Sequence, residues 1–306
     1  MDDGRQDKIF MMGVDIGGTF LRLGIVDQDR CLYEYHQQSS DILFTENAVE
    51  DLKQILLEYI GSNSRYNITG IAVGIPGQVS SDGSFVYAVP RIPGLNNADL
   101  GRILTKETGI PVHIDRDVNY LLIHDIKTGD LDPRKDRTIL GFYIGTGLGN
   151  GIWINGNIYR GKHGVSGETG HIPLYEVNDR CACGKIGCAE VRCSGEYLEK
   201  IVNSHFPDCF IGDIFTKYGK DKRIQKFIRD LALPLATEIT IMDPHTVVIG
   251  GGVVGMKDFP QKLFKENLID KTGCPVTAKD LSVFYSDNVK TAGIIGGCIF
   301  LFDKML

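Results

Sequence analysis

The chain has 306 residues and a net charge of −6, and 42% of its residues are hydrophobic. This length and apolar content suffice for one large core or two ordinary ones, and we expect two lobes. Negative charge without a basic stripe argues against nucleic acid as the main partner. Since no run approaches the ~20 apolar residues of a membrane span and no leader or lipidation motif is evident, we expect a cytoplasmic protein without a membrane partner.

The first part of the chain predicts three strands followed by a helix. Residues 9–26 hold two apolar runs with the glycines of DIGGT between them, which is typical of two strands joined by a tight turn. A third strand is expected over 31–37. Apolar residues at helical spacing then predict an amphipathic helix over 48–60.

Two more strands and a helix are expected next along the chain. Residues 68–75 form an apolar run that ends at Pro-Gly, and residues 112–114 lead directly into the polar sequence DRDVN. A helix is expected over 120–126. Polar residues at the carboxyl end of a strand often make sites in α/β sheets, so DRDVN is a candidate site.

The second half repeats this plan and predicts a duplicated α/β fold. A strand over 138–144, a glycine turn over 145–149 and a return strand over 151–154 have the same organisation as residues 9–26. We expect the last helix to pack on the first lobe. The remaining expected elements are a helix over 223–242 with a kink at Pro234, a strand over 247–249, a helix near 259–268, a strand over 281–285 and a helix over 291–302.

Three glycine segments are candidates for phosphate or nucleotide binding. In DIGGT and in IGTGLG, glycine lets backbone N–H groups approach phosphate oxygens, and the threonine hydroxyl adds a donor. One such turn is weak evidence because hairpins need glycine, whereas two matched turns are stronger. The GGG segment after an apolar strand suits close passage past adenosine or phosphate, although it lacks the dinucleotide fingerprint. The candidates are Gly17, Gly18, Thr19, Gly145, Thr146, Gly147, Gly250, Gly251 and Gly252, with Asp15 as a carboxylate that could hold magnesium through water.

A zinc site is expected from His171, Cys181, Cys183 and Cys188. Three thiolates and one imidazole complete the tetrahedral shell of Zn²⁺ and leave no position for a catalytic water, so the metal would be structural. A disulfide pair or unligated thiols are the alternatives, but a disulfide needs an oxidising compartment. The other cysteines, Cys31, Cys193, Cys209, Cys274 and Cys298, are expected to be mostly buried.

Carboxylates near these motifs are the candidates for chemistry. Glu168 and Glu190 flank the cysteine loop, so folding around zinc would carry both into a polar pocket. Asp117 in DRDVN is the candidate general base, able to accept the proton of a sugar hydroxyl as that oxygen attacks a γ-phosphate. Asp115 competes for this role, and either aspartate could instead cap the following helix.

Taken together, these motifs resemble the ROK family of sugar kinases, within the actin-like ATPase superfamily. The sequences DIGGT, GIPG, DVN, IGTGLG, GETGH, CACGKIGCAE and IGGGV occur in the family's order over nearly the whole chain. The resemblance implies a two-lobed α/β, actin-like ATPase (ribonuclease H-like) fold with a structural zinc site. We expect a smaller N-terminal lobe of 1–117 plus 291–306 and a larger C-terminal lobe of 118–290 that carries the zinc loop.

The resemblance also implies roles and partners. Asp117 would be the catalytic base, ATP and Mg²⁺ would be required, and a homodimer is implied. The glycine turns would bind phosphates, and residues 250–252 would face the nucleotide. His171 would bind zinc through one ring nitrogen and could present the other to the sugar. The residues implied to contact a hexose are Gly77, Arg116, Asn119, Glu168, His171 and Glu190.

Two departures from the family pattern bear on specificity. ROK glucokinases usually read NDAN, where this chain has Arg116 before Asp117. Arginine is long, charged and donor-only, so a geometry tuned to an equatorial 3-hydroxyl should not survive unchanged. RDVN and its companion motifs look most like the D-allose kinase branch, and allose has an axial 3-hydroxyl. D-allose is therefore the expected substrate, with glucose or an N-acetylhexosamine as alternatives, while Arg91 is a second departure.

Two alternatives to a kinase are less favoured. Repressors of the family carry a winged helix-turn-helix before the first glycine turn, and only fourteen residues precede Asp15 here. A non-catalytic sugar sensor would have no need of both phosphate turns and Asp117. The sequence therefore predicts ATP-dependent transfer to the 6-hydroxyl of an aldohexose.

Overall fold

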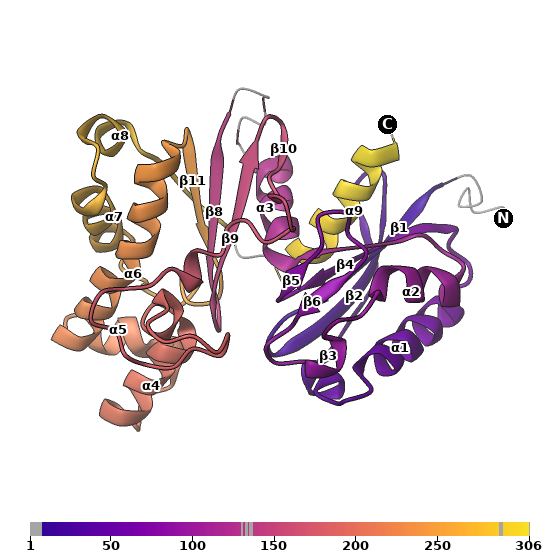
Figure 1. Cartoon of the computed structure of the whole chain (residues 1–306), viewed down its shortest axis with the longest axis horizontal. Coiled ribbons are helices and arrows are strands. Elements are labelled where there is room, and N and C mark those ends of the chain that lie inside the picture. Colours follow the sequence, from indigo (N-terminus) through magenta and orange to yellow (C-terminus); the bar gives the residue numbers. More distant parts are fainter. Residues whose placement is uncertain (1–7, 130, 132–133, 135–136, 288–289, 306) are drawn as a thin grey trace. The chain divides into compact units, whose positions relative to one another are not determined.

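The structure is a computed structural model that describes residues 8–129, 131, 134, 137–287 and 290–305. It divides into two compact units, each built around a five-stranded sheet (Figure 1). Unit 1 comprises Met1–Leu131, Arg160–Ser166 and Lys290–Leu306. Unit 2 comprises Asp132–Tyr159 and Gly167–Val289.

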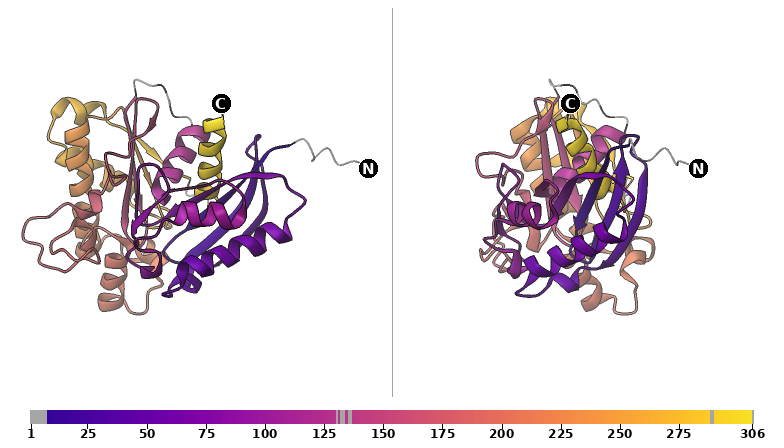
Figure 2. Two further views of the ribbon diagram at one scale, coloured as in Figure 1. Left: turned by 45° about the vertical axis from the view of Figure 1, so that its right-hand side comes forward. Right: turned by 90° about the vertical axis from the view of Figure 1, so that its right-hand side faces the viewer.

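Unit 1 has a mixed sheet with helices on both faces (Figure 2). Its strands are β1 (Phe10–Ile16), β2 (Phe20–Asp27), β3 (Leu32–Ser39), β4 (Ile68–Ile75) and β7 (Val112–Arg116), with a small hairpin of β5 (Gln78–Val79) and β6 (Val86–Ala88). Its helices are α1 (Ala48–Ser62), α2 (Leu100–Thr108), α3 (Asp117–Thr128) and α9 (Ala292–Met305), with 3₁₀ helices η1 (Ser40–Leu43) and η2 (Pro93–Leu95). The strand order is β3-β2-β1-β4-β7; β1, β2 and β3 are antiparallel, and β4 and β7 run parallel to β1.

The alternation of side chains along β1 explains why helices cover both faces of this sheet. Met12 and Val14 pack in the core that holds α1 and α2, whereas Met11 packs with Ile294 and Cys298 of α9. Successive side chains of a strand point to opposite faces, so a strand that is buried at every position, as β1 is, needs cover on both sides.

The last helix packs on unit 1, as expected. Gly296 of α9 lies so close to α3 that a Cβ atom there would overlap the carbonyl oxygen of Tyr120. Tyr120 is fully buried, so α3 is part of the core of unit 1. The expected boundary after residue 117 is therefore wrong for α3, which belongs to unit 1, and residues 160–166 also belong there.

Unit 2 repeats the topology of unit 1. Its strands are β8 (Ile139–Ile144), β9 (Leu148–Ile154), β10 (Asn157–Ile158), β11 (Thr246–Gly250) and β12 (Ser282–Tyr285). Its helices are α4 (Gly195–His205), α5 (Ile214–Tyr218), α6 (Lys222–Met242), α7 (Gln261–Lys271) and α8 (Pro275–Asp280), with 3₁₀ helices η3 (Thr169–His171), η4 (Ala189–Val191) and η5 (Ile211–Asp213). The strand order is β10-β9-β8-β11-β12, with the first three antiparallel and the rest parallel to β8. The prediction of a duplicated fold is confirmed.

Helix α6 supplies much of the core of unit 2. Asp221 caps it by accepting a hydrogen bond from the backbone N–H of Arg223 at 2.9 Å. Its buried face includes Ile224, Phe227 and Leu231, and the helix continues through Pro234. Figure 1 shows α6, α7 and α8 on the same side of the second sheet. None of the helices in the described ranges has both the length and the hydropathy to span a bilayer.

The cysteines outside the expected zinc site fall into two groups. Cys193, Cys209 and Cys298 are buried, as expected. Cys31 and Cys274 are exposed, because Cys31 follows the turn after β2 and Cys274 precedes α8. Most of these five cysteines are therefore buried, as expected.

Candidate active site and metal centre

Several predicted site residues of unit 1 lie at one edge of its sheet. The strands β1, β4 and β7 are parallel, so their carboxyl ends meet at the same edge. The register sets Asp15 opposite Gly74, and Gly74 opposite Asp115. Gly77 follows β4 at this edge and donates its N–H to the carbonyl of Ile75 at 2.9 Å. The DIGGT turn, Gly77 and DRDVN are thus brought together by strand pairing.

The carboxylate of Asp115 is buried and fully engaged. Its Oδ1 accepts hydrogen bonds from the backbone N–H of Arg116 at 2.8 Å and from Nδ2 of Asn119 at 2.7 Å. Its Oδ2 accepts from Nε of Arg160 at 3.0 Å and from Nη2 at 2.5 Å. Four donors of the chain occupy the two oxygens of Asp115, so this carboxylate has little capacity left to accept a hydrogen bond from a substrate.

Asp117 has a different environment from Asp115. It is the first residue of α3 and is half-buried, and its Oδ1 accepts a hydrogen bond from the backbone N–H of Val118 at 2.8 Å. A carboxylate in the first turn of a helix is favoured by the helix dipole. Asn119 is buried, and its side-chain amide donates a hydrogen bond to Asp115. Arg116 is also buried, and its guanidinium donates to the carbonyl of Ser166. Within DRDVN, Asp117 is therefore the less buried of the two carboxylates.

The first glycine turn is closed by a backbone hydrogen bond and has two further backbone N–H groups that could donate to a ligand. The N–H of Gly17 donates to the carbonyl of Phe20 at 2.9 Å. The N–H groups of Gly18 and Thr19 have no hydrogen-bond partner within the described ranges, and Thr19 is exposed. This geometry suits an anion such as phosphate.

Asp15 lies buried behind the same turn. Its Oδ2 accepts a hydrogen bond from Nη1 of Arg22 at 2.9 Å. Burial raises the pKa of Asp15, although the charge of Arg22 and its hydrogen bond act in the opposite direction. A magnesium ion held by this carboxylate would have to compete with Arg22.

The second glycine turn, in unit 2, has a similar arrangement. It is closed by the N–H of Gly145, which donates to the carbonyl of Gly147 at 3.1 Å. In the part of unit 2 that the structure describes, the N–H groups of Thr146 and Gly147 have no hydrogen-bond partner. The first residues of α4 support the turn, because the N–H of Gly195 donates to Gly145 at 2.8 Å and that of Glu196 donates to Thr146 at 3.1 Å.

The third glycine segment lies beside the second turn. Because β11 is parallel to β8, Gly250 pairs with Tyr143 immediately before Ile144 and the turn. Gly251 has φ +96° and packs so tightly that a Cβ atom would overlap the backbone of Ile144. Gly252 is exposed. The two segments thus form one glycine-lined edge of unit 2, as a nucleotide site requires.

The four predicted zinc ligands converge in unit 2. The ligand atoms of His171, Cys181, Cys183 and Cys188 all lie within 4.8 Å of one another. The Sγ atoms of Cys183 and Cys188 are 3.6 Å apart, and Sγ of Cys181 is 3.7 Å from Nδ1 of His171. A tetrahedral zinc with bonds of about 2.0–2.3 Å separates its ligands by about 3.5–3.8 Å, whereas bonded sulfurs are about 2.05 Å apart. The donor set therefore fits zinc and excludes a Cys183–Cys188 disulfide.

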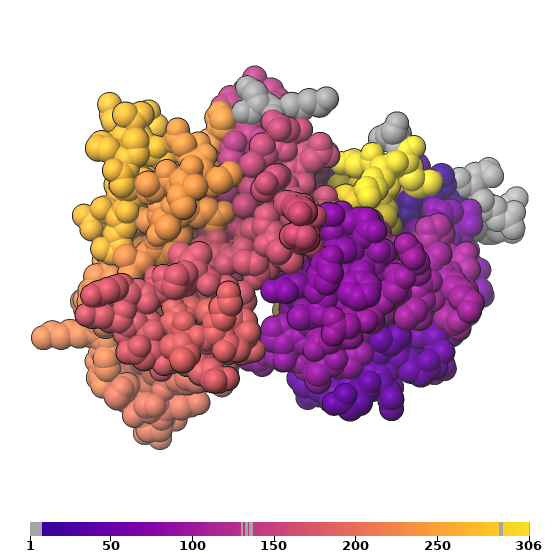
Figure 3. All heavy atoms as spheres, viewed as in Figure 1, coloured from indigo at the N-terminus to yellow at the C-terminus, as the bar shows by residue number. Residues whose placement is uncertain are grey.

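The two predicted carboxylates contact different ligands of this centre. Oε2 of Glu168 lies 3.4 Å from Nε2 of His171, so the ring nitrogen that faces away from the cysteines is next to a carboxylate. Such a partner orients a metal-bound histidine and fixes its tautomer. Oε1 of Glu190 lies 4.0 Å from Sγ of Cys181, and its Oε2 accepts a hydrogen bond from the backbone N–H of Leu148 at 3.0 Å. The loop that carries the centre lies at the surface of unit 2 (rose in Figure 3).

No sequence motif singles out Arg160, Ser166 or Arg22 as site residues. Arg160 and Ser166 reach the DRDVN sequence from a segment that begins 41 residues after Asn119, and Arg22 reaches Asp15 across the β1–β2 pair. The alternation of β2 could have identified Arg22, since Arg22 lies opposite Asp15 in the register.

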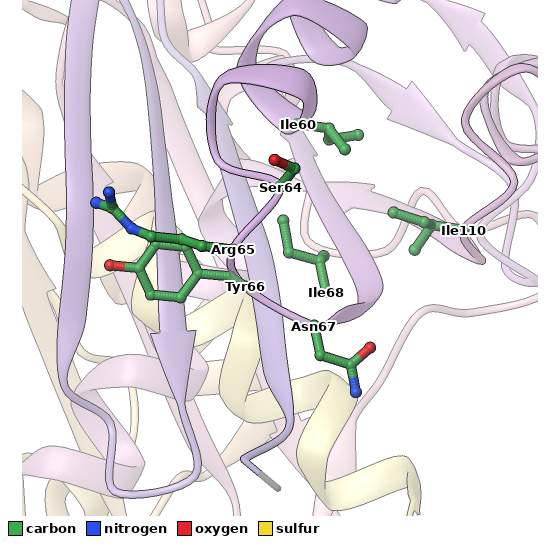
Figure 4. Close-up of a pocket in the computed structure, with 7 residues that line it drawn as sticks. All are labelled: Ile60, Ser64, Arg65, Tyr66, Asn67, Ile68 and Ile110. Atoms are coloured by element: carbon green, nitrogen blue, oxygen red, sulfur yellow. The ribbon is translucent and has the colours of Figure 1, made fainter. Parts of the chain in front are cut away.

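A separate hollow of unit 1 holds none of the predicted site residues. It is open, has a volume of about 570 Å³, and lies between the end of α1 and the start of β4 (Figure 4). Its lining residues are Ile60, Ser64, Arg65, Tyr66, Asn67, Ile68 and Ile110.

Comparisons with known proteins agree with this fold and these motifs. A model of the ROK family matches residues 11–304. An N-acetyl-D-glucosamine kinase from Yersinia pseudotuberculosis is 32% identical over 83% of this chain and 87% of its own length. A glucokinase from Halalkalibacterium halodurans is 28% identical over 94% of this chain and 93% of its own.

The solved structures agree on the fold. A ROK family glucokinase from Streptomyces griseus, in complex with glucose and AMPPNP, superposes with a TM-score of 0.79 at 22% identity, over 95% of this chain and 98% of that chain. The expected α/β, actin-like ATPase-type fold is therefore confirmed. On this evidence the chain is a member of the ROK family and lies among its sugar kinases.

Proposed function

We propose that the protein is an ATP-dependent kinase of the 6-hydroxyl of an aldohexose, with D-allose as the substrate. The observation that carries the proposal is the contrast between the two aspartates of DRDVN. Asp115 has both oxygens engaged by donors, while Asp117 is half-buried at the start of α3. That contrast supports Asp117 as the general base.

In the proposed reaction, Asp117 accepts the proton of the 6-hydroxyl as its oxygen bonds to the γ-phosphorus of ATP. The bond from that phosphorus to the leaving oxygen of ADP breaks, and the proton passes from Asp117 to solvent. The products are hexose 6-phosphate and ADP. Mg²⁺, when bound with ATP, neutralises charge on the β- and γ-phosphates. The residues of this chain align the hydroxyl and hold the phosphates.

Nucleotide binding is proposed for the glycine segments. The N–H groups of Thr146 and Gly147 would donate to phosphate oxygens, as would those of Gly18 and Thr19 in unit 1. Residues 250–252 would lie against the nucleotide. Support comes from the absence of any partner for these four N–H groups within the described parts of the chain.

Sugar binding in unit 2 is proposed for Glu168, His171 and Glu190. Zinc, held by His171 and the three cysteines, would supply no step of the reaction and would fix the loop that carries these side chains. Support comes from the contacts of both carboxylates with the ligand cluster.

The choice of D-allose rests on Arg116. Its guanidinium is buried and donates to the carbonyl of Ser166, so it replaces the amide found in glucokinases with a fixed donor-only group. Asn119 and Gly77 remain proposed sugar contacts, with the amide of Asn119 also holding Asp115. The relatives named for glucose and N-acetyl-D-glucosamine make these sugars the principal alternatives.

The test is ADP release from ATP with D-allose, D-glucose, D-mannose, D-fructose, N-acetylglucosamine and N-acetylmannosamine, compared by kcat/KM. We expect turnover with the highest value for D-allose. If another hexose is preferred, D-allose is the wrong substrate but the proposed kinase activity stands. If no sugar is turned over, a non-catalytic sugar sensor is favoured.

The same assay tests the base through Asp117→Asn. We expect kcat to fall by about 10²–10⁴-fold while the affinity for the sugar is retained. Asp270→Asn, a matched change at an exposed position of unit 2, should leave kcat unchanged. Ordinary turnover by Asp117→Asn would show that another group accepts the proton.

A further inference from the structure

We propose that Glu190 couples the metal cluster to the second glycine turn, so that the bound metal sets the affinity of unit 2 for nucleotide. The inference deepens the proposed function and rests on it, since it concerns the same turn. Glu190 would act here as a positioning residue, because its carboxylate contacts the backbone of the turn and a ligand sulfur and would not touch the nucleotide.

The side chain of Glu190 bridges the turn and the cluster. Its Oε2 accepts a hydrogen bond from the N–H of Leu148 at 3.0 Å, and its Oε1 lies 4.0 Å from Sγ of Cys181. Gly147 provides the space for this carboxylate, because a Cβ atom there would overlap Oε2 of Glu190. The turn, the carboxylate and one ligand sulfur are therefore in consecutive contact.

The backbone around Glu190 is tied to the metal ligands. Glu190 lies in η4, which begins immediately after the ligand Cys188. The N–H of Ala189 donates to the carbonyl of Ile172 at 2.9 Å, which ties η4 to the residue after His171. Because ligands lie on both sides of this contact, a bound metal fixes the position of η4.

The same stretch of chain continues to the turn. The N–H of Cys193 donates to the carbonyl of Glu190 at 3.3 Å, and two residues later Gly195 donates to Gly145 at 2.8 Å. The side chain of Glu190 and the start of α4 therefore hold the turn at both ends. Displacing η4 would loosen the turn at Leu148 and at Gly145 together.

The charge of Glu190 is consistent with this indirect role. A carboxylate in contact with phosphate would repel it. By accepting the N–H of Leu148, Glu190 fixes the end of the turn and leaves the N–H groups of Thr146 and Gly147 for an anion. Pre-organised donors of this kind bind an anion without the cost of ordering the loop.

The experiment measures the affinity of the full chain for AMPPNP by calorimetry without sugar, with zinc content determined on the same samples. Glu190→Ala should weaken binding about tenfold, since one charge-assisted hydrogen bond to the turn is lost. Glu190→Gln, whose amide oxygen can still accept from Leu148, should retain the affinity. Removing the metal with a chelator should weaken wild-type binding and add little to the effect of Glu190→Ala.

A double-mutant cycle with Gly147→Ala tests the contact itself. Gly147→Ala should weaken nucleotide binding in the wild-type background, because its Cβ displaces Glu190, and much less in the Glu190→Ala background. Equal affinities for wild type, metal-free wild type and Glu190→Ala would overturn the coupling while leaving nucleotide binding intact. A wild-type protein that binds no AMPPNP would overturn the proposed function as well.

Discussion

The guanidinium of Arg160 donates two hydrogen bonds to the buried carboxylate of Asp115, which lies 45 residues earlier in the sequence. Nε is 3.0 Å and Nη2 is 2.5 Å from Oδ2. The Asp115 side chain is 4% exposed and that of Arg160 is 17% exposed, so water screens the pair little. Arg160 also lies over the ring of Phe300, at 5.1 Å from its centroid. The pair therefore joins the end of β7, the segment 160–166 and α9 in one contact.

Arg160→Ala is expected to destabilise unit 1 strongly. It leaves Asp115 buried without its counter-charge, and removal of one partner of a buried pair costs about 3–5 kcal/mol. The free energy of unfolding in urea measures this. Arg102→Ala removes an exposed partner of Asp99 in the same unit and should change stability little. Equal stability of Arg160→Ala and wild type would show that Asp115 is solvated or protonated in the folded protein.

Local sequence patterns predicted much of the fold and the metal centre. The two glycine turns, the strands beside them and the long helix over residues 223–242 follow from apolar periodicity and turn chemistry. The metal ligands could be predicted from the type and spacing of the donor residues. Three cysteines in one short loop lie close in space however the rest of the chain folds. The strand, glycine turn and return strand that occur in both halves likewise predicted the duplicated topology.

Contacts between distant segments were not predictable in this way. Local sequence left Asp115 as a competitor of Asp117, and only the family resemblance favoured Asp117. The hydrogen bonds that distinguish the two aspartates involve Arg160, which approaches from a segment distant in sequence. The placement of α3 in unit 1 was missed for a similar reason, because it depends on the close approach of Gly296 in α9 to Tyr120. Such packing leaves no periodic signal in either segment alone.

Cys183→Ser is expected to lose the metal. The four ligand atoms lie within 4.8 Å of one another, and a hydroxyl is a poor substitute for a thiolate in such a site. Zinc content should fall from about one per chain to near zero, and the thermal midpoint should fall by about 5–10 °C. Cys274→Ser removes an exposed thiol outside the cluster and should change neither quantity. Retention of stoichiometric zinc by Cys183→Ser would rule out Cys183 as a required ligand.

Arg116→Asn is expected to shift sugar preference. The shorter amide loses the hydrogen bond to the carbonyl of Ser166 and restores an acceptor at this position. The ratio of kcat/KM for D-allose to that for D-glucose should fall about tenfold, as changes of one polar group in a sugar pocket allow. Arg102→Asn is the matched exposed change in unit 1 and should leave the ratio unaltered. An unchanged ratio in Arg116→Asn would remove Arg116 as the determinant of specificity.

His113 is expected to make the stability of unit 1 depend on pH. Its Nδ1 lies 3.2 Å from the hydroxyl of Tyr120, and its ring centroid is 4.6 Å from that of Phe300. Burial lowers the pKa of His113 to about 4, with Asp115 and Asp82 acting to raise it and Lys304 and Arg160 acting to lower it.

The direction of this dependence follows from the two pKa values. The histidine has a pKa of about 6.5 in the unfolded chain and about 4 in the folded protein. Between these values the unfolded chain binds a proton that the folded protein does not. Stability is therefore lost as the pH falls from about 6.5 towards 4, by up to about 1.4 kcal/mol per pH unit.

Urea unfolding of wild type and His113→Gln at several pH values between about 4 and 7.5 measures this contribution. Glutamine cannot take up the proton, so the variant should lose less stability than wild type over the acid half of that range. Above pH ~7 the free energies of unfolding of the two proteins should change with pH in the same way. His36→Gln, an exposed change on β3, should keep the wild-type slope. If His113→Gln kept that slope too, the pKa of His113 would be the same in the folded and unfolded protein, and burial would not lower it.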